Sequence, residues 1–393
     1  MLAGAAYRDI TPAKVEGLHL AGFGAGRTAT GVLDPIELQA LYLKKGAQEV
    51  ALVTIDCIGV NLPLVEAIRK GVKDLDAQAI IVMATHTHSA PDTIGMWGPA
   101  FLGLVPKKSG VDPQWLHLLI QRAIEAIHEA RERAVPAYVR AASIEIDKQW
   151  TRNDREKGER YDEAVAMAFE DSEGTRIATL LNFASHPEAL WNENRLISAE
   201  HPGYFRAQMR ELHPTGVPLY VSGPLGGMLT PNVPEKSDSD ARIAYIKRLG
   251  GHLAKACEQA LSDAVLESEP ELMHRHMSFK LKNANRRFTL LSKLKLIGVR
   301  LEQGVIESEV HHLQIGQTEA LSAPGEMLPE LGHRVRALMK APHRLLLGLA
   351  IDELGYILPE AQYDDRDYRY EKSMSVGRDT AKALLSAHRE LLA

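Results

Sequence analysis

The run Ala79–Ala84 constrains the fold more than any other part of the sequence. It is continuously apolar and has the length of a strand, which is typical of a strand covered on both faces. Apolar residues at helical spacing precede it at Leu62–Val72 and follow it at Trp115–Arg133. Strands that alternate with helices in this way predict an α/β fold with a partly parallel sheet.

The same alternation recurs through the rest of the chain. A hairpin of two strands, Ala164–Glu170 and Arg176–Ala184, opens the second part. The other expected strands are Leu38–Lys44, Val50–Ile55, Tyr138–Ile146, Pro218–Ser222, Leu272–Lys282, Phe288–Arg300, Val305–Gln314 and Arg344–Ile351, and the other expected helices are Tyr204–Leu212, Asp240–Ala264, Leu328–Met339 and one from Arg378. The sequence thus predicts mixed, partly parallel sheets layered with helices, in two similar βα halves that form one catalytic unit.

One segment is a candidate for an internal joint. Glu267–Glu271 is acidic and contains Pro270. It would separate lobes of residues 1–264 and 271–393 within a single domain that spans residues 1–393. Beyond the joint, residues 280–300 carry seven Lys and Arg and no acid. On the hairpin expected there, we interpret this charge as a solvated face.

The composition excludes several classes of function. The 46 Lys and Arg against 51 Asp and Glu give a net charge of −5, so the chain lacks the basic field that holds nucleic acid. No apolar run approaches the roughly 20 residues of a membrane-spanning helix, and no signal peptide is visible. The two cysteines, Cys57 and Cys257, cannot make a disulfide framework. We therefore expect a cytoplasmic enzyme with no nucleic-acid partner and no integral membrane segment.

Two histidines follow the buried strand directly, in Thr85-His86-Thr87-His88-Ser89. Catalytic groups of α/β proteins gather at the carboxyl ends of strands. Two histidines one residue apart on extended chain can point the same way, and neutral imidazole is a common zinc ligand. The string therefore indicates a metal site, and spacing alone allows both histidines to bind one ion.

The kind of metal site is narrowed by the residues that follow. A metallo-β-lactamase site would need Asp and His where Ala90 and Pro91 stand, so that class is excluded. An amidohydrolase barrel also opens with two histidines in this spacing after a strand, and it stays an alternative. The other alternative is a pair of ordinary loop histidines.

Further polar residues stand at comparable places. His186 follows the strand that ends at Ala184, and Glu326 lies in the constrained turn Pro324-Gly325-Glu326, although either could be an ordinary capping residue. The glycines of Pro224–Asn232 would let backbone N–H groups approach a ligand, unless this is only a tight loop. Four tyrosines crowd with acidic residues near the C-terminus, as a pocket wall or a surface loop: Tyr356, Tyr363, Tyr368 and Tyr370.

Taken in order, these strings resemble the catalytic domain of the neutral/alkaline ceramidase family. The resemblance rests on THTHS, NFASHP, GGMLTPN, APGE and a Gly-Tyr pair followed by a Tyr-Glu pair. Near the N-terminus, Asp9–Pro12 and the glycine-rich Ala21–Gly24 agree with it. THTHS is the most specific block.

The resemblance implies one Zn²⁺ ion per chain. His86 and His186 would bind the ion, and Glu326 and Tyr356 would complete the ligands. His88 would then face the substrate, whereas spacing alone also allows it to bind the ion. The resemblance further implies catalytic roles for His88, Arg152, Tyr370 and Thr230, and substrate contacts for Gly226, Gly227 and Trp97.

Some of these positions depart from the family pattern. Arg152 stands in Trp150-Thr151-Arg152-Asn153, where the family has Asn-Arg-Ser, and Met228 and Thr230 replace an Asp and a Ser. Trp97 lies in the apolar stretch of residues 96–106, which could line an acyl pocket or be a buried loop that only fills space.

The function implied by the resemblance is a zinc-dependent hydrolase that cleaves the amide bond of a small N-acyl substrate with a zinc-activated water. Because the family's C-terminal sandwich domain and an export signal are not visible, soluble N-acyl compounds are expected rather than membrane lipids. The alternatives are a metal-dependent esterase or deacetylase acting on a sugar or secondary metabolite, and a non-catalytic binding protein on the same scaffold. The sequence indicates no oligomeric state.

Overall fold

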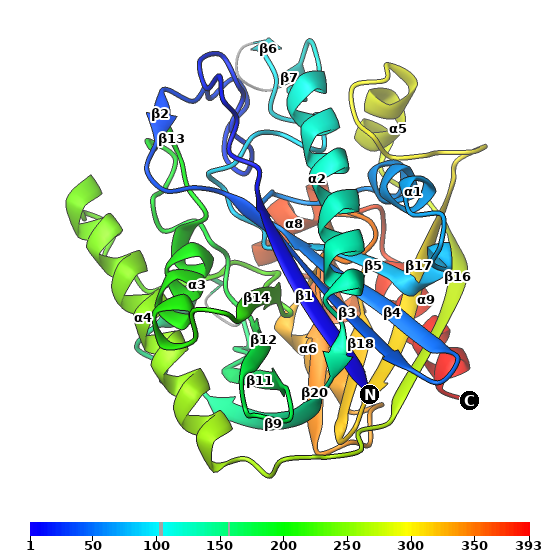
Figure 1. The fold of residues 1–393 in the computed structure, drawn as a ribbon. Helices are drawn as coiled ribbons and strands as arrows, with labels where there is room; N and C mark the ends of the chain where they lie inside the picture. The colour runs from blue at the N-terminus through cyan, green and yellow to red at the C-terminus, as the bar shows by residue number, and fades with distance from the viewer. Residues whose placement is uncertain (102–104, 156–157) are drawn as a thin grey trace.

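In a computed structural model, which describes residues 1–101, 105–155 and 158–393, the chain forms three larger mixed sheets layered with helices (Figure 1). The first sheet has the order β5-β4-β3-β1-β8, with β1 (Leu2–Asp9), β3 (Glu37–Lys45), β4 (Gln48–Ile55), β5 (Ile80–Ala84) and β8 (Val135–Pro136). The second has the order β14-β12-β11-β9, with β9 (Tyr138–Glu145), β11 (Glu163–Glu170), β12 (Arg176–Phe183) and β14 (Val217–Ser222). The third has the order β16-β17-β18-β20, with β16 (Leu272–Lys282), β17 (Val305–Ile315), β18 (Thr318–Ser322) and β20 (His343–Leu347). The predicted fold class is confirmed.

One local arrangement recurs in all three sheets. An antiparallel hairpin is followed by a helix, and the helix leads to a strand that pairs in parallel with the second hairpin strand. The three copies are β3-β4-α1-β5, β11-β12-α3-β14 and β17-β18-α6-β20, with α1 (Leu62–Gly71), α3 (Glu200–Leu212) and α6 (Pro329–Arg336). The sequence predicts two similar halves, and the structure adds this third copy. The carboxyl ends of three parallel pairs are therefore available to one site.

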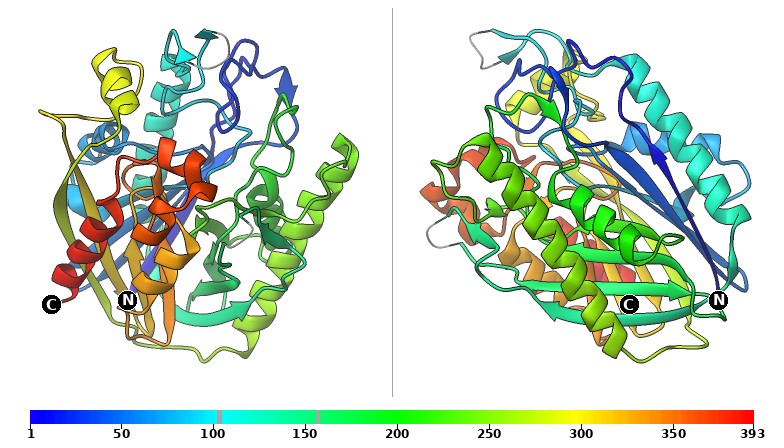
Figure 2. Two further views of the ribbon diagram at one scale, coloured as in Figure 1. Left: turned by 180° about the vertical axis from the view of Figure 1, so that it is seen from behind. Right: turned by 60° about the vertical axis from the view of Figure 1, so that its left-hand side comes forward.

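The sheets are stacked between helices (Figures 1 and 2). Helices α1 and α2 (Pro113–Glu132) cover the outer face of the first sheet, whose inner face packs on the other two sheets. Helices α3 and α4 (Ser239–Asp263) cover the second sheet, and α9 (Thr380–Leu392) covers the third. The largest apolar core contains residues from Ala3 to Ile351, so both sides of the predicted joint contribute to it.

A buried ion pair joins the first sheet to the helix of the second copy. Asp56, directly after β4, is fully buried, and Arg206 of α3 is 1% exposed. Arg206 Nη1 donates to Asp56 Oδ1 at 3.0 Å, and Nη2 donates to the other oxygen. The same carboxylate accepts from the Thr85 hydroxyl at 3.1 Å, which fixes the first residue of THTHS.

Most predicted elements are present, with bounds that move by a few residues. The strand expected at Phe288–Arg300, and with it the hairpin at residues 280–300, is wrong. This segment contains helix α5 (Arg286–Lys293), which Asn285 caps by accepting from the N–H groups of Arg287 and Phe288. Phe288 and Leu291 are buried one helical turn apart, and this spacing is helical. Strands β1 and β18 were not among the expected elements.

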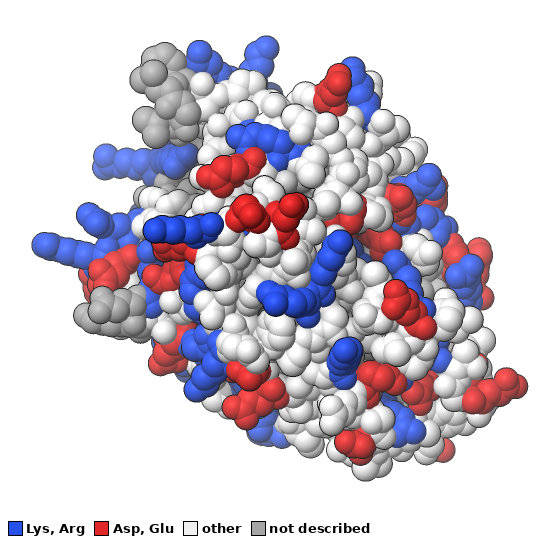
Figure 3. Space-filling view, turned by 90° about the vertical axis from the view of Figure 1, so that its left-hand side faces the viewer, with Lys and Arg blue, Asp and Glu red and all other residues white. Residues whose placement is uncertain are grey.

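The described surface agrees with the modest net charge. On the face shown in Figure 3, acidic and basic side chains are interspersed. In the described parts of the chain, no helix combines the length and the apolar character that crossing a membrane requires.

We expect Arg206→Met and Asp56→Asn each to lower the free energy of unfolding by about 3–5 kcal/mol, because each leaves a buried partner without its counterpart. Urea melts followed by circular dichroism measure this. Arg300→Met is the matched control, because Arg300 pairs with Glu66 through side chains that are 48% and 43% exposed, and about 1 kcal/mol or less is expected there. Equal losses in all three variants would contradict the special role of the buried pair.

Candidate metal centre and its cavity

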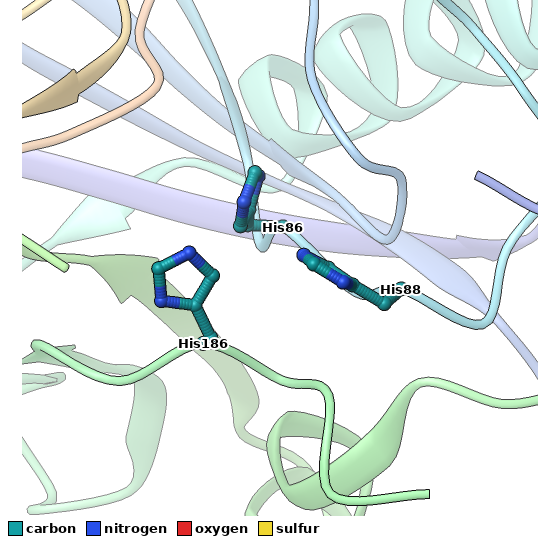
Figure 4. Close-up of side chains that lie close together, drawn as sticks. All are labelled: His86, His88 and His186. Atoms are coloured by element: carbon teal, nitrogen blue, oxygen red, sulfur yellow. The ribbon is translucent and has the colours of Figure 1, made fainter. Parts of the chain in front are cut away.

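The ends of three strands, one from each copy of the recurring arrangement, bring the predicted ligands together. His86 follows β5, His186 follows β12, and Glu326 begins the short strand β19 (Glu326–Met327) after β18. The rings of His86 and His186 have centroids 5.0 Å apart, and His88 lies 5.0 Å and 5.6 Å from them (Figure 4). All three histidines are buried.

Backbone carbonyls orient the rings of His86 and His186. Nδ1 of His86 lies 2.5 Å from the Ile58 carbonyl oxygen, and Nδ1 of His186 lies 3.0 Å from that of Leu229. A carbonyl only accepts, so Nδ1 carries a proton, and Nε2 is the nitrogen directed to the centre. Both Nε2 atoms face Glu326 Oε2, at 3.5 Å for His86 and 3.1 Å for His186. Metal-binding histidines are held in this way, with the second nitrogen on a carbonyl or carboxylate.

Tyr356 stands beside Glu326 because their strands pair in parallel. Strand β21 (Tyr356–Ile357) places Tyr356 opposite Glu326 in the register. The Tyr356 hydroxyl lies 4.0 Å from Met228 Sδ, and the side chain is buried. Tyr356 is therefore a candidate ligand at the same centre as Glu326.

The charges at this centre favour a cation. Burial opposes a proton on His186, but the Glu188 and Glu326 carboxylates outweigh it and raise its pKa. Burial likewise opposes ionisation of Glu326, but His86 and His186 lower its pKa below the usual range. A buried carboxylate that raises the pKa of His186 also attracts a metal ion.

His88 differs from the other two histidines in its surroundings. Neither of its ring nitrogens has a hydrogen-bond partner in the described parts of the chain. Burial, together with His86 and His186, lowers its pKa well below the usual range, so the ring is neutral. Its Nδ1 lies 3.3 Å from a carboxylate oxygen of Glu188.

The donor set fits a divalent metal ion such as zinc. One ligand atom from each of His86, His88 and His186 lies within 4.8 Å of the others. Two imidazoles whose Nε2 atoms converge on one carboxylate form the histidine-and-acid set that zinc accepts. Because their Nε2 atoms face Glu326, His86 and His186 are better candidates for metal ligands than His88. The mixed sheets exclude the amidohydrolase-barrel alternative, which requires a closed parallel barrel.

A cavity of about 460 Å³ opens above the centre. His86, His88, Glu326 and Tyr356 line its polar end. The remaining wall is largely apolar, and among its residues are Phe23, Ile58, Ile94, Met96, Trp97, Ile297, Val299 and Phe288. Residues 102–104 of the predicted acyl-pocket stretch lie outside the described residues.

Three of the eight non-glycine residues with a positive φ angle in the described parts of the chain line this cavity. His86, Trp191 and Met228 line it and have φ angles of 69°, 68° and 64°, in the left-handed region that favours glycine. Such conformations cost about 1–3 kcal/mol each and are typical of functional sites. The surrounding fold therefore holds these residues for a purpose other than stability.

The other predicted site residues are divided between two places. Tyr370 and Trp97 line the main cavity. Arg152 and Thr230 are paired across β10 (Thr151–Asn153) and β15 (Leu229–Pro231) and line a neighbouring pocket of about 250 Å³. Arg152 donates to Asp154 Oδ1 at 2.6 Å, and Asp154 lines both spaces.

The two glycines lie behind the centre. A Cβ atom on Gly226 would come within 2.5 Å of the Glu326 carbonyl oxygen, so only glycine allows this approach. The Gly226 N–H donates to the Met327 carbonyl at 2.9 Å. Gly227 faces Leu328 and Tyr368. Both glycines support the strand that carries Glu326.

Two carboxylates of the cavity wall, buried Glu188 and partly buried Glu353, are not among the predicted site residues. Glu188 stands two residues after His186, and this proximity was an available signal. Glu353 has no comparable signal, because only the tertiary fold brings its loop to the cavity.

Comparison with known proteins gives a consistent result. Residues 1–216 match the sequence pattern of the family described as neutral/alkaline non-lysosomal ceramidase, N-terminal. The neutral ceramidases of Drosophila melanogaster and Drosophila pseudoobscura pseudoobscura are each 26% identical over 149 residues, which is 35% of this chain and 21% of theirs. The match thus spans about one fifth of the length of these curated relatives.

Two solved structures share the fold over the whole chain. The neutral ceramidase from Pseudomonas aeruginosa has a TM-score of 0.83 at 17% identity and is covered to 74%. A ceramidase complexed with C2 has a TM-score of 0.81 at 16% identity, also with 74% covered. The family resemblance drawn from THTHS and the other strings is confirmed. Of the proposed ligands, His86 and His186 lie in the matched range, and Glu326 and Tyr356 lie beyond it.

We expect His86→Ala and His186→Ala to purify with less than about a tenth of the metal of the unaltered chain, because each removes an oriented Nε2. His88→Ala should keep near-stoichiometric metal. Inductively coupled plasma mass spectrometry of the purified proteins measures this. His274→Ala, at a histidine on β16, is the control and should retain all metal. Loss of metal from His88→Ala as large as that from His86→Ala would make His88 a ligand.

Proposed function

The chain belongs to the neutral/alkaline non-lysosomal ceramidase family, and from this membership we propose that it is a zinc-dependent hydrolase of the amide bond of an N-acyl substrate. One observation carries the proposal. The Nε2 atoms of His86 and His186 converge on the Glu326 carboxylate at the polar end of a largely apolar cavity. We further propose that residues 1–393 act as one catalytic unit, because ligands from both sides of the Glu267–Glu271 segment meet at this centre.

Zinc, held by His86, His186, Glu326 and Tyr356, would supply a Lewis acid and lower the pKa of a coordinated water. The chain's own groups would do the remaining work. His88 stands beside the ligands with a neutral ring and is the side chain best suited by type to move a proton to the departing nitrogen. Tyr370 lines the same cavity and would donate a hydrogen bond to the developing oxyanion.

Arg152 and Thr230 would have a different role from His88 and Tyr370. Both line the smaller pocket, which shares Asp154 and Trp191 with the main cavity. The ion pair between Arg152 and Asp154 fixes the wall between the two spaces. We propose that this smaller pocket receives polar groups of the amine portion, with the Thr230 hydroxyl as a hydrogen-bonding group.

The apolar wall indicates where the acyl chain would lie. Ile58, Ile94 and Trp97 line the space beside His86 and His88. An acyl chain in this space removes apolar surface from water, and each buried methylene contributes about 0.8 kcal/mol. The proposed substrate class is therefore an N-acyl amine with an apolar acyl chain, and ceramide, for which the relatives are named, belongs to the compounds to be tested.

The direct test is turnover of matched N-acyl amines and esters by metal-loaded protein. We expect amide hydrolysis that disappears when a chelator removes the metal and returns when Zn²⁺ is added, because the donor set favours zinc. Release of the free amine, measured by mass spectrometry, is the readout. Hydrolysis of the ester without the amide would favour the esterase alternative, and no hydrolysis of either by the zinc-loaded protein would favour a binding function.

We expect kcat/KM to rise by about fourfold per acyl methylene until the apolar part of the cavity is filled, as about 0.8 kcal/mol per methylene implies. Trp97→Ala should flatten this dependence, because it removes part of the apolar wall. A series of N-acyl amines of increasing chain length measures the slope, with the N-acetyl compound as the internal control that Trp97→Ala should leave nearly unchanged. A slope that Trp97→Ala does not alter would place the acyl chain elsewhere.

A further inference from the structure

Glu188 is a buried carboxylate whose place in the cavity has no structural explanation so far. Glu188 is 5% exposed and lines the cavity beside the candidate metal centre. Within the described parts of the chain, its carboxylate makes no hydrogen bond, and its ion-pair contact is the one at 3.3 Å from Oε2 to His88 Nδ1. A buried charge without compensating hydrogen bonds is costly, so a role in the site is the more economical explanation of its presence.

The backbone around Glu188 is tied to the segment that carries His88. The His88 N–H donates to the Pro187 carbonyl at 3.0 Å. On the other side of Glu188, the N–H groups of Ala189 and Leu190 donate to the two carboxylate oxygens of buried Glu200, each at 3.0 Å. The backbone on both sides of Glu188 is thus fixed.

The ring of His88 is confined as well. A Cβ atom on Gly22 would lie 2.3 Å from His88 Cγ, so the chain passes directly against one side of the ring. Phe23 packs edge-on at a centroid distance of 4.9 Å. With the ring confined, its Nδ1 edge faces Glu188, and Figure 4 shows the far end of the ring directed toward His86 and His186.

We propose that Glu188 is a positioning residue that fixes the tautomer of His88, with the proton on Nδ1 and the lone pair of Nε2 directed to the metal centre. A carboxylate only accepts hydrogen bonds, so the nitrogen beside it carries the proton. The 3.3 Å contact joins the two atoms, His88 Nδ1 and Glu188 Oε2, that this hydrogen bond would connect. The same logic holds when a carboxylate orients the imidazole of a hydrolytic triad.

The consequence for catalysis rests on the proposed function. As a water oxygen adds to the carbonyl carbon, its proton passes to His88 Nε2, and Nδ1 keeps its proton toward Glu188. When the C–N bond breaks, its electron pair goes to nitrogen, and Nε2 returns the proton to that nitrogen. The products are a carboxylic acid and an amine, and His88 regains its starting tautomer.

The tautomer itself is measured by ¹⁵N NMR of the zinc-loaded protein labelled at histidine, with His88 assigned by its disappearance in His88→Ala. We expect Nδ1 of His88 to be the protonated nitrogen in the unaltered chain and in Glu188→Asp. In Glu188→Ala we expect the proton to distribute over both nitrogens. An unchanged His88 signal in Glu188→Ala would overturn the proposal, and this readout requires no turnover.

The kinetic arm uses the same variants. Glu188→Ala should lower kcat by about 10²-fold or more at nearly unchanged KM and unchanged zinc content, because the loss of proton transfer affects the transition state. Glu188→Asp should recover part of the rate. Adding Glu188→Ala to His88→Ala should cause little further loss, because the two residues act as a unit. Glu193→Gln, at an exposed residue of the same loop, is the control for loss of one negative charge.

The two arms separate this inference from the proposed function. If the unaltered chain hydrolyses no N-acyl amine but the His88 tautomer changes in Glu188→Ala, the positioning role stands and the proposed substrate class is wrong. If the amide is hydrolysed and Glu188→Ala keeps the full kcat, the positioning role is overturned and the proposed function stands.

Discussion

The buried ion pair between Asp56 and Arg206 is the interaction on which the rest of the structure depends. It joins the end of β4 to helix α3, which packs on the second sheet. The Asp56 carboxylate also accepts a hydrogen bond from the Thr85 hydroxyl. Ser222, at the end of β14, donates to the Thr85 carbonyl at 2.8 Å from the other side. The THTHS segment therefore begins at a point where two sheets are fixed to each other. A pair this deeply buried contributes little net stability, but it is well suited to specify one arrangement.

The candidate metal centre follows from the threefold use of one arrangement. Each hairpin, helix and parallel strand places the carboxyl ends of two strands at the same edge, and three such edges face one cavity. His86, His186 and Glu326 come from separate sheets, so none of them can reach the centre unless the sheets are packed. Asn182 of β12 donates to and accepts from Leu346 of β20, at 3.0 Å each, and thereby fixes the second sheet against the third. The rigidity of the stacked sheets is the reason that strained residues such as His86 and Met228 persist at their edge.

The sequence predicts those parts of the fold and site that depend on short-range patterns. The apolar run before His86 and the histidine after β12 are local signals, and both histidines lie where the strand ends place them. The segment at Phe288–Arg300 was misjudged because a short helix with two buried residues resembles a strand when the capping role of Asn285 is overlooked. The family resemblance selected Glu326 among many acids. Spacing could not, because its approach to His186 depends on the packing of two sheets. Glu188 is not among the predicted site residues, although it stands two residues after His186, which the sequence singles out.

His86 and His88 show that the same local sequence does not determine the chemistry of a histidine. Both follow the same strand, and both lie in a Thr-His pair. The group behind Nδ1 differs, because His86 has the Ile58 carbonyl and His88 has the Glu188 carboxylate. A neutral carbonyl orients the ring and leaves Nε2 with the moderate basicity that suits a metal ligand. A carboxylate beside Nδ1 accepts a hydrogen bond from it, and in the positioning role proposed for Glu188 this keeps the lone pair of His88 on Nε2. The difference between the two histidines therefore lies in the loops that pack behind them, and it exists only once the first and second sheets have come together.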